Sequence, residues 1–343
     1  MRVVTTIAAL AALTCALALS GCERAARLET LDGVAQGTTY RIQWQSNDRV
    51  DRDTVAAAVS AELDRIDALL SNYRADSVLE RFNRSPSVDA YLLPEELVRL
   101  LSLAMHVHEA SDGCFDPTVL PLVRLWGFDG EKPHVPEAAD IAATLEHVGL
   151  DKLRIVDATH VQKTVPALEI DMSSIGQGYA IDRLGTVLEG LGIHDYLVEL
   201  GGEIVALGTK PGARRWRIGI EEPLREREVV AQSLSVPPNR KTAVVTSGTY
   251  RHYFEEHGRM FSHILDPHTG EPVRHGPMAV TVVSSTPTLA AAWGTALTCL
   301  GPERGLAVAQ ANGIAAILSN QVNSEIHEQQ TSVLAREWTG ALQ

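Results

Sequence analysis

The stretch DMSSIGQGYA at residues 171–180 joins a predicted strand to a predicted helix and decides the fold. The apolar segment 168–170 precedes it, and helical periodicity extends over about 175–191. Gly176 and Gly178 match the start of a dinucleotide-binding loop, but the final glycine of that loop is absent, and the chain contains no Walker A sequence. The stretch therefore predicts neither a Rossmann-type nor a P-loop nucleotide site.

Helical and strand patterns are mixed along the rest of the chain. Apolar residues three and four positions apart predict a helix after Asp51, and further helices are expected over 94–109 and 287–300, the last ended by Gly301-Pro302. Apolar or alternating runs bounded by turn residues predict strands over 38–45, 153–156, 196–200, 204–207, 216–220, 229–236, 243–246 and 279–284. Strand runs separated by single helices, with no repeat or long linker, predict an α+β fold of largely antiparallel sheets packed with helices.

Composition excludes several classes of protein. The 343 residues include 43 Asp and Glu against 30 Lys and Arg, a net charge of −13, which argues against nucleic acid or an anionic membrane surface as the main partner. A 45% hydrophobic and 21% charged composition excludes a disordered chain and a polytopic membrane protein. Four cysteines are too few for a disulfide scaffold, and the spacing of Cys114 and Cys299 leaves open whether those two pair.

The N-terminus has the features of a targeting segment. Arg2 precedes an apolar run over 7–19, which is too short to span a bilayer in the usual way and suits a signal peptide. The run ends in Leu-Ser-Gly-Cys at residues 19–22, which resembles the bacterial lipobox. We therefore predict a lipoprotein signal peptide over 1–21, a lipid anchor on Cys22 and a location on a membrane, facing the periplasm or cell exterior. An ordinary signal peptide followed by a chance cysteine is the alternative.

Several longer motifs follow one another over most of the chain. They are GTTY at 37–40, SNYR at 71–74, RFN at 81–83, GCFDPTV at 113–119, PLVRLWGF at 121–128, DMSSIGQGYA at 171–180, ELGGE at 199–203, TSGTY at 246–250 and SHILDPHTG at 262–270. Together they resemble the ApbE family of FAD:protein FMN transferases. The resemblance implies the ApbE-like flavin transferase fold over 33–318, after a tether over 22–32, and leaves the polar segment 319–343 unassigned.

The resemblance also implies a reaction. FAD is split at its diphosphate, FMN is joined to a Thr or Ser hydroxyl of an acceptor protein, and AMP leaves. The acceptor expected by analogy is a membrane or periplasmic redox protein. Such phosphoryl transfer requires that the flavin be held, that the diphosphate charge be neutralised, which implies Mg²⁺, and that a hydroxyl be activated.

Residues at matching positions receive roles from the resemblance. His263 is the expected general acid–base, and the expected cofactor-binding residues are Gln36, Tyr73, Cys114, Phe115, Asp116, Asp171, Gln177 and Leu265. Structural roles remain open for some of them: Asp116 before a proline suits a tight turn, and Asp171 suits the N-cap of a helix. His263 could equally be a hydrogen-bonded structural histidine.

One predicted helix face departs from the family pattern. Positions 291, 294 and 295 are spaced i, i+3, i+4 and share a face, on which family members carry one or two metal-binding acids before a threonine. This chain has Ala291 and Gly294 there, so Thr295 and Ser174 are the remaining predicted metal ligands, and a working transferase would hold Mg²⁺ with them, Asp171, backbone carbonyls and FAD itself. Because Mg²⁺ prefers carboxylate and phosphate oxygens, two alternatives stay open: an FAD-binding pseudoenzyme, and a slow FAD pyrophosphatase that releases FMN and AMP.

Overall fold

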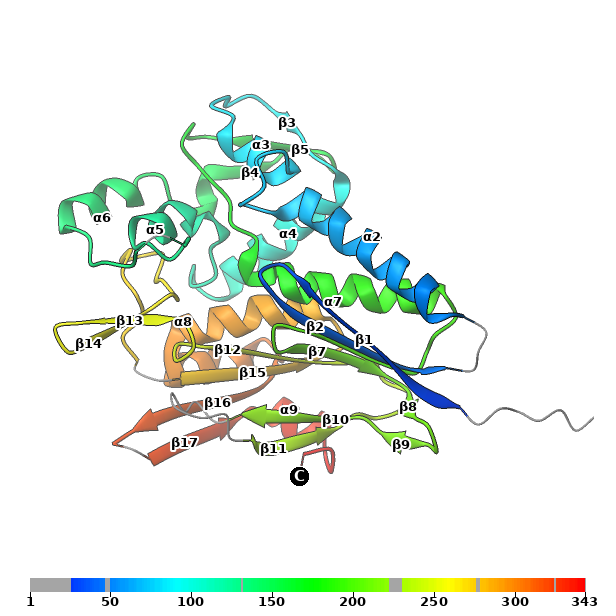
Figure 1. Ribbon diagram of the computed structural model, residues 1–343. Helices are drawn as coiled ribbons and strands as arrows, with labels where there is room; N and C mark the ends of the chain where they lie inside the picture. Colours follow the sequence, from blue (N-terminus) through cyan, green and yellow to red (C-terminus); the bar gives the residue numbers. More distant parts are fainter. Residues whose placement is uncertain are drawn as a thin grey trace, which may run out of the picture.

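Figure 1 shows the computed structural model, which describes residues 26–46, 50–130, 132–221, 230–275, 278–323 and 325–342. The predicted signal peptide over 1–21 and the predicted lipid-bearing Cys22 lie outside the described residues. Within those ranges, no helix combines the length and apolar character that a membrane span requires.

One large sheet forms the centre of the molecule (Figure 1), in the order β1-β2-β6-β7-β12-β15-β16-β17. Its strands are β1 (Arg27–Ala35), β2 (Thr38–Ser46), β6 (Tyr196–Leu200), β7 (Glu203–Leu207), β12 (Thr242–Gly248), β15 (Met278–Ser284), β16 (Ala315–Val322) and β17 (Glu325–Gln330). Every neighbouring pair in it is antiparallel. The predicted α+β class with antiparallel sheets is therefore confirmed.

Helices and small sheets surround this sheet. The helices are α2 (Arg52–Leu70), α3 (Val78–Arg84), α4 (Glu95–Ala110), α5 (Leu120–Leu125), α6 (Ala138–Leu145), α7 (Ser173–Gly190), α8 (Pro287–Ala311) and α9 (Ser332–Glu337), with 3₁₀ turns η1 (Pro117–Val119) and η2 (Leu150–Lys152). The small sheets contain β3 (Tyr91–Leu92), β4 (Leu153–Ile155) and β5 (His160–Lys163), β8 (Thr209–Lys210) with β9 (Arg214–Arg215), β10 (Arg217–Glu221) with β11 (Val230–Ser235), and β13 (Tyr253–Glu256) with β14 (Arg259–Ser262).

The two faces of the large sheet pack against different layers. On one face α7 and α8 lie along the strands, with α2 and α4 outside them (Figure 1). On the other face lie β10, β11 and α9, whose Ile218, Leu234 and Leu334 share a second apolar cluster. Side chains alternate along β7 accordingly, because Val205 belongs to the helix-side core and Ala206 to the opposite cluster.

The predicted strand over 168–170 is wrong. Ile170 is fully buried but pairs with no strand, since its amide donates to Asn83 Oδ1 at 2.8 Å and its carbonyl accepts from Asn83 Nδ2 at 2.9 Å. The Asn72 side-chain amide donates to the same carbonyl at 2.9 Å. Side-chain amides from the 71–83 region thus satisfy the backbone groups that a sheet would otherwise pair.

The predicted helix end at Leu300 matches a break in α8, because Gly301 has non-helical angles (φ 79°, ψ 177°), and a second helical segment follows to Ala311. Two other segment boundaries differ from expectation. The predicted tether over 22–32 is part of the fold from Arg27 onward, because β1 begins there. The unassigned segment 319–343 supplies the end of β16, all of β17 and α9.

Helices α7 and α8 approach closely because small residues face each other. A Cβ atom built on Gly178 would lie 2.7 Å from the carbonyl oxygen of Pro287 and 2.8 Å from Cβ of Ala291. Ala291 is itself only 1% exposed. The absence of a side chain at 178 therefore sets the distance between the two helices.

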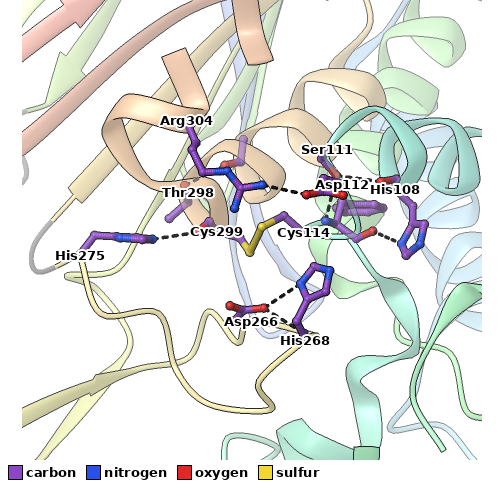
Figure 2. The surroundings of a disulfide bond; sticks show 12 residues. His108, Ser111, Asp112, Cys114, Asp266, His268, His275, Thr298, Cys299 and Arg304 are labelled. Atoms are coloured by element: carbon purple, nitrogen blue, oxygen red, sulfur yellow. Dashed lines mark hydrogen bonds and ion pairs between the residues drawn. A yellow bond between two sulfur atoms is a disulfide. The ribbon is translucent and has the colours of Figure 1, made fainter. Parts of the chain in front are cut away.

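A disulfide joins Cys114, in the loop after α4, to Cys299, just before the α8 kink, with 5.6 Å between their Cα atoms (Figure 2). This settles the pairing that the spacing left open. Two contacts support the bridge: a ring N–H of His275 donates to the carbonyl of Cys299 at 2.8 Å, and Arg304 pairs with Asp112 at 2.9 Å. The cross-link fixes the 113–119 loop against α8 over a sequence separation of 185 residues.

Replacing Gly178 by Ala is expected to lower the free energy of unfolding by about 1–3 kcal/mol, because the added methyl group forces α7 and α8 apart. The matched control is Gly176→Ala in the same helix, where an added Cβ meets no atom within 4 Å. That change should alter stability by less than about 1 kcal/mol, towards stabilisation. Urea unfolding followed by circular dichroism measures both, and equal effects would contradict the packing account.

Candidate active site

A cleft of about 890 Å³ opens where α7 begins. Its walls come from the β1–β2 turn, one side of α2, the 71–74 segment and the first turns of α7. Three of the predicted cofactor-binding residues line it together, namely Gln36, Tyr73 and Gln177, along with Ser173. A volume of this size is within the range of clefts that bind large organic ligands.

The β1–β2 turn places Gln36 at the cleft. Gln36 and Gly37 have φ values of 50° and 74°, and Ala35 pairs with Thr38 across the turn. Two successive residues with positive φ are typical of a two-residue hairpin turn. This conformation is unusual for a glutamine. The pairing of β1 with β2 holds the turn in it, and the turn forms part of the cleft wall.

Tyr73 is presented by a short, hydrogen-bonded segment after α2. Ser71 Oγ accepts from the backbone amides of Tyr73 and Arg74, each at 3.2 Å. The tyrosine side chain is 79% exposed, an unusual state for a large ring that also lines a cleft. Desolvation of the phenol group and the nearby carboxylates of Asp171 and Asp129 raise the pKa of Tyr73.

Asp171 lies directly before Met172, the N-cap residue of α7. Its Oδ1 accepts from the Ser173 amide at 2.8 Å, and its own amide donates to the carbonyl of Pro117 at 2.6 Å. Burial raises the pKa of Asp171, while the Ser173 hydrogen bonds and Arg124 oppose the shift. The predicted N-cap role is therefore wrong, because the N-cap residue is Met172, which has no side-chain cap; Asp171 instead holds the first amide of α7, that of Ser173.

Cys114, Phe115 and Asp116 lie away from this cleft. Cys114 is bound in the disulfide, and Phe115 is 1% exposed in the core. The Asp116 carboxylate is enclosed by donors, with Thr118 N at 2.8 Å, Thr118 Oγ1 at 2.6 Å and the Leu150 amide at 3.1 Å. These contacts make Asp116 the organiser of the η1 turn.

Leu265 lies in a third apolar cluster, with Trp126 and Phe261, and does not line the cleft. The structure therefore brings Gln36, Tyr73 and Gln177 together and keeps the 114–116 loop and Leu265 in supporting positions.

His263 is held in one orientation beside β13. Its Nδ1–H donates to the carbonyl of His252 at 3.0 Å, and the two imidazole rings meet edge to face at 5.3 Å. Burial lowers the pKa of His263 to about 4, although the hydrogen bond to His252 opposes this. The ring is therefore neutral near pH 7, and with Nδ1 occupied as a donor, Nε2 carries the lone pair that a general base requires.

The predicted metal face lies on α8. Thr295 is half-buried there, Ala291 faces Gly178, and a Cβ built on Gly294 would lie 2.6 Å from Ser247 Oγ. Among the described residues, no group of three His, Cys, Asp or Glu side chains could hold a metal ion. The acids that a metal site would require are thus absent from α8.

Sequence reasoning missed two features of the site. Ser60, Asp64 and Asp67 of α2 line the cleft. The helix periodicity places them on one side of α2, but that this side faces the cleft is known only from the packing of α2 over α7. Glu203, at the start of β7, has a buried carboxylate oxygen. The sequence shows Glu203 directly after Gly201-Gly202, as part of the 199–203 motif. It does not show that this side chain is buried.

These features define a class of α+β protein. It has one large antiparallel sheet, two closely packed helices on one face and a cleft at the start of the inner helix. A family model described as the ApbE family matches residues 36–318. The chain belongs to the ApbE family.

Curated relatives and solved structures agree. The FAD:protein FMN transferase of Klebsiella pneumoniae (strain 342) is 35% identical over 309 residues, which cover 87% of each chain. That of Vibrio cholerae serotype O1 is 36% identical, over 90% of this chain and 92% of the relative. The crystal structure of Pseudomonas stutzeri flavinyl transferase ApbE, apo form, matches with a TM-score of 0.82 and 37% identity, over 92% of this chain and 98% of that one.

The buried His263 gives a pH prediction. Between about pH 6.5 and pH 4 the unfolded chain binds a proton that the folded ring does not, so His263 makes stability fall as pH falls through this window. His263→Gln should make that decline shallower. His106→Gln, at an exposed position of α4, should leave it unchanged. Urea midpoints at pH 4.5 and 7 provide the measurement, and identical slopes for His263→Gln and the wild type would refute a neutral buried imidazole.

Proposed function

We propose that this chain is an FAD:protein FMN transferase. The observation that carries the proposal is the family match over residues 36–318 together with a cleft that gathers Gln36, Tyr73 and Gln177. Relatives 34–36% identical over about nine-tenths of this chain bear that name. They favour the transferase over the pseudoenzyme and pyrophosphatase alternatives.

The chemistry follows from the parts of the site. The acceptor's Thr or Ser oxygen attacks the phosphorus on the FMN side of the FAD diphosphate, the bond to the bridging oxygen breaks, and AMP leaves with that oxygen. Nε2 of His263 takes the hydroxyl proton as the new ester forms. Tyr73 offers an aromatic face to the flavin or adenine ring, and the positive end of the α7 dipole would attract the phosphates.

A divalent cation, expected to be Mg²⁺, supplies neutralisation of diphosphate charge when it is bound. Ser174 and Thr295 would contribute hydroxyl oxygens to it. Those two neutral oxygens do not suffice for a hard cation, so a carboxylate must come from elsewhere in the chain.

The predicted location is supported by one observation. A disulfide between Cys114 and Cys299 suits an oxidising compartment outside the cytosol. We infer from it, and from the predicted lipobox ending at Cys22, a lipoprotein that faces the periplasm or cell exterior and meets a redox protein there as acceptor.

The transferase is tested by incubating the full chain in detergent with FAD, Mg²⁺ and a protein that carries a flavinylation Thr or Ser. We expect covalent flavin on the acceptor hydroxyl, seen as in-gel fluorescence and a mass increase, with one AMP released for each flavin attached. The control acceptor has that hydroxyl residue replaced by Ala. FAD binding without transfer would overturn the proposal, and AMP release without labelled acceptor would favour the pyrophosphatase.

The role of Tyr73 is tested by Tyr73→Ala and Tyr73→Phe. Loss of the ring is expected to weaken FAD binding about 5- to 30-fold, or about 1–2 kcal/mol, whereas Phe keeps the aromatic face and should bind within about twofold of the wild type. Quenching of flavin fluorescence measures both. Equal FAD affinity for the Ala variant and the wild type would exclude Tyr73 from the flavin contact.

A further inference from the structure

Glu203 carries a buried carboxylate oxygen without an internal explanation. Its Oε2 is inaccessible to solvent and has no hydrogen-bond partner within the described part of the chain. An unpartnered buried carboxyl group destabilises the folded protein, so its position at the head of β7 calls for a ligand that compensates it.

The strand places this side chain on the helix side of the sheet. Along β7, Val205 belongs to the core under α7 and α8, whereas Ile204 packs against the opposite cluster. Because side chains alternate along a strand, Glu203 points to the same face as Val205. Its partner across the β6–β7 hairpin, Leu200, belongs to the helix-side core as well.

The strand that carries Glu203 packs against both helices, α7 and α8. Gly201, in the turn that leads into this strand, lies against α7, since a Cβ atom built there would be 2.9 Å from Nε2 of Gln177. The neighbouring strand β12 pairs Val244 with Ile204 and carries Ser247 on the helix side, where its Oγ faces Gly294 of α8. Glu203 therefore lies on the sheet face that α7 and α8 cover, at the end of β7 where Gly201 meets Gln177.

The guanidinium beside the β6–β7 turn is already paired with another acid. Arg251 Nη1 would lie 3.3 Å from a Cβ atom on Gly202, but its guanidinium is paired through Nη2 with Glu221 at 2.6 Å. Glu199 is also engaged, because its Oε1 accepts from the Gly202 amide at 2.8 Å. The two acids of the ELGGE motif thus differ: Glu199 holds the turn, and Glu203 is left with an unused oxygen.

We propose that Glu203 is the carboxylate that holds a divalent cation against the FAD diphosphate, in place of the acids missing at Ala291 and Gly294. The proposal rests on the proposed function for the identity of the diphosphate. Ser174 and Thr295 would add hydroxyl oxygens from α7 and α8. Glu203 supplies the charge that those neutral oxygens lack.

The test measures linkage between cation and diphosphate, without turnover. Calorimetry determines the affinity of the full chain in detergent for ADP, with and without Mn²⁺. Mn²⁺ is expected to strengthen ADP binding to the wild type and to the Glu199→Gln control. In Glu203→Gln the Mn²⁺-dependent gain should fall about tenfold or more, while ADP affinity without metal stays within about twofold.

A second pair of variants guards against a folding defect. Glu203→Asp keeps the charge and should retain part of the Mn²⁺-dependent gain, whereas Glu203→Ala should lose it as Glu203→Gln does. An undiminished gain in Glu203→Gln, or no gain in the wild type, overturns the proposal. Lost FMN transfer with an unchanged gain also overturns it, because Glu203 would then act on the acceptor instead of the cation.

The same data separate this proposal from the proposed function. A Mn²⁺-dependent gain that requires Glu203, in a chain that transfers no FMN to any acceptor, would leave the cation site standing and remove the transferase. FMN transfer with no dependence of ADP binding on Mn²⁺ would do the reverse.

Discussion

The close contact between α7 and α8 is the constraint on which the site depends. With no side chain at Gly178 and only a methyl group at Ala291, the two helices lie against each other over the helix-side face of the sheet. That contact fixes where α7 begins, and the start of α7 forms one wall of the cleft. It also fixes Thr295 one turn along α8. A larger residue at 178 would displace the cleft wall and the α8 face together.

The remaining elements hold this pair in place from both ends. The disulfide ties α8 just before its kink to the loop after α4, and Asp116 organises the turn that follows in the same loop. The carbonyl of Pro117 in that turn accepts from the Asp171 amide at 2.6 Å, directly before α7. Cys114 and Asp116 therefore influence the cleft by positioning the start of α7, although they do not line it.

How much the sequence could predict depended on how local the information was. The pattern of α2 is local, and its predicted apolar residues Val55, Val59, Leu63, Ile66 and Leu70 are all buried. Strand β17 is mostly exposed and shows no alternation, so it gave no signal. The error at Ile170 was non-local, because the side-chain amide that replaces a strand partner belongs to Asn83, 87 residues away. The order of the motifs predicted residues of the cleft, whereas only the three-dimensional structure shows that Glu203 is buried.

The net charge of −13 poses a physical difficulty for a protein whose substrate is itself an anion. A diphosphate that enters beside Asp64 and Asp67 is repelled unless positive charge is supplied. The amides at the start of α7 supply partial charge only, and the guanidinium of Arg74 at the cleft is already paired with Asp76 at 2.7 Å. A cation held by Glu203 would reverse the sign of the field at the phosphates, and by linkage the diphosphate would then hold the cation. Carboxylates around an anionic substrate are therefore consistent with binding when a cation lies between them.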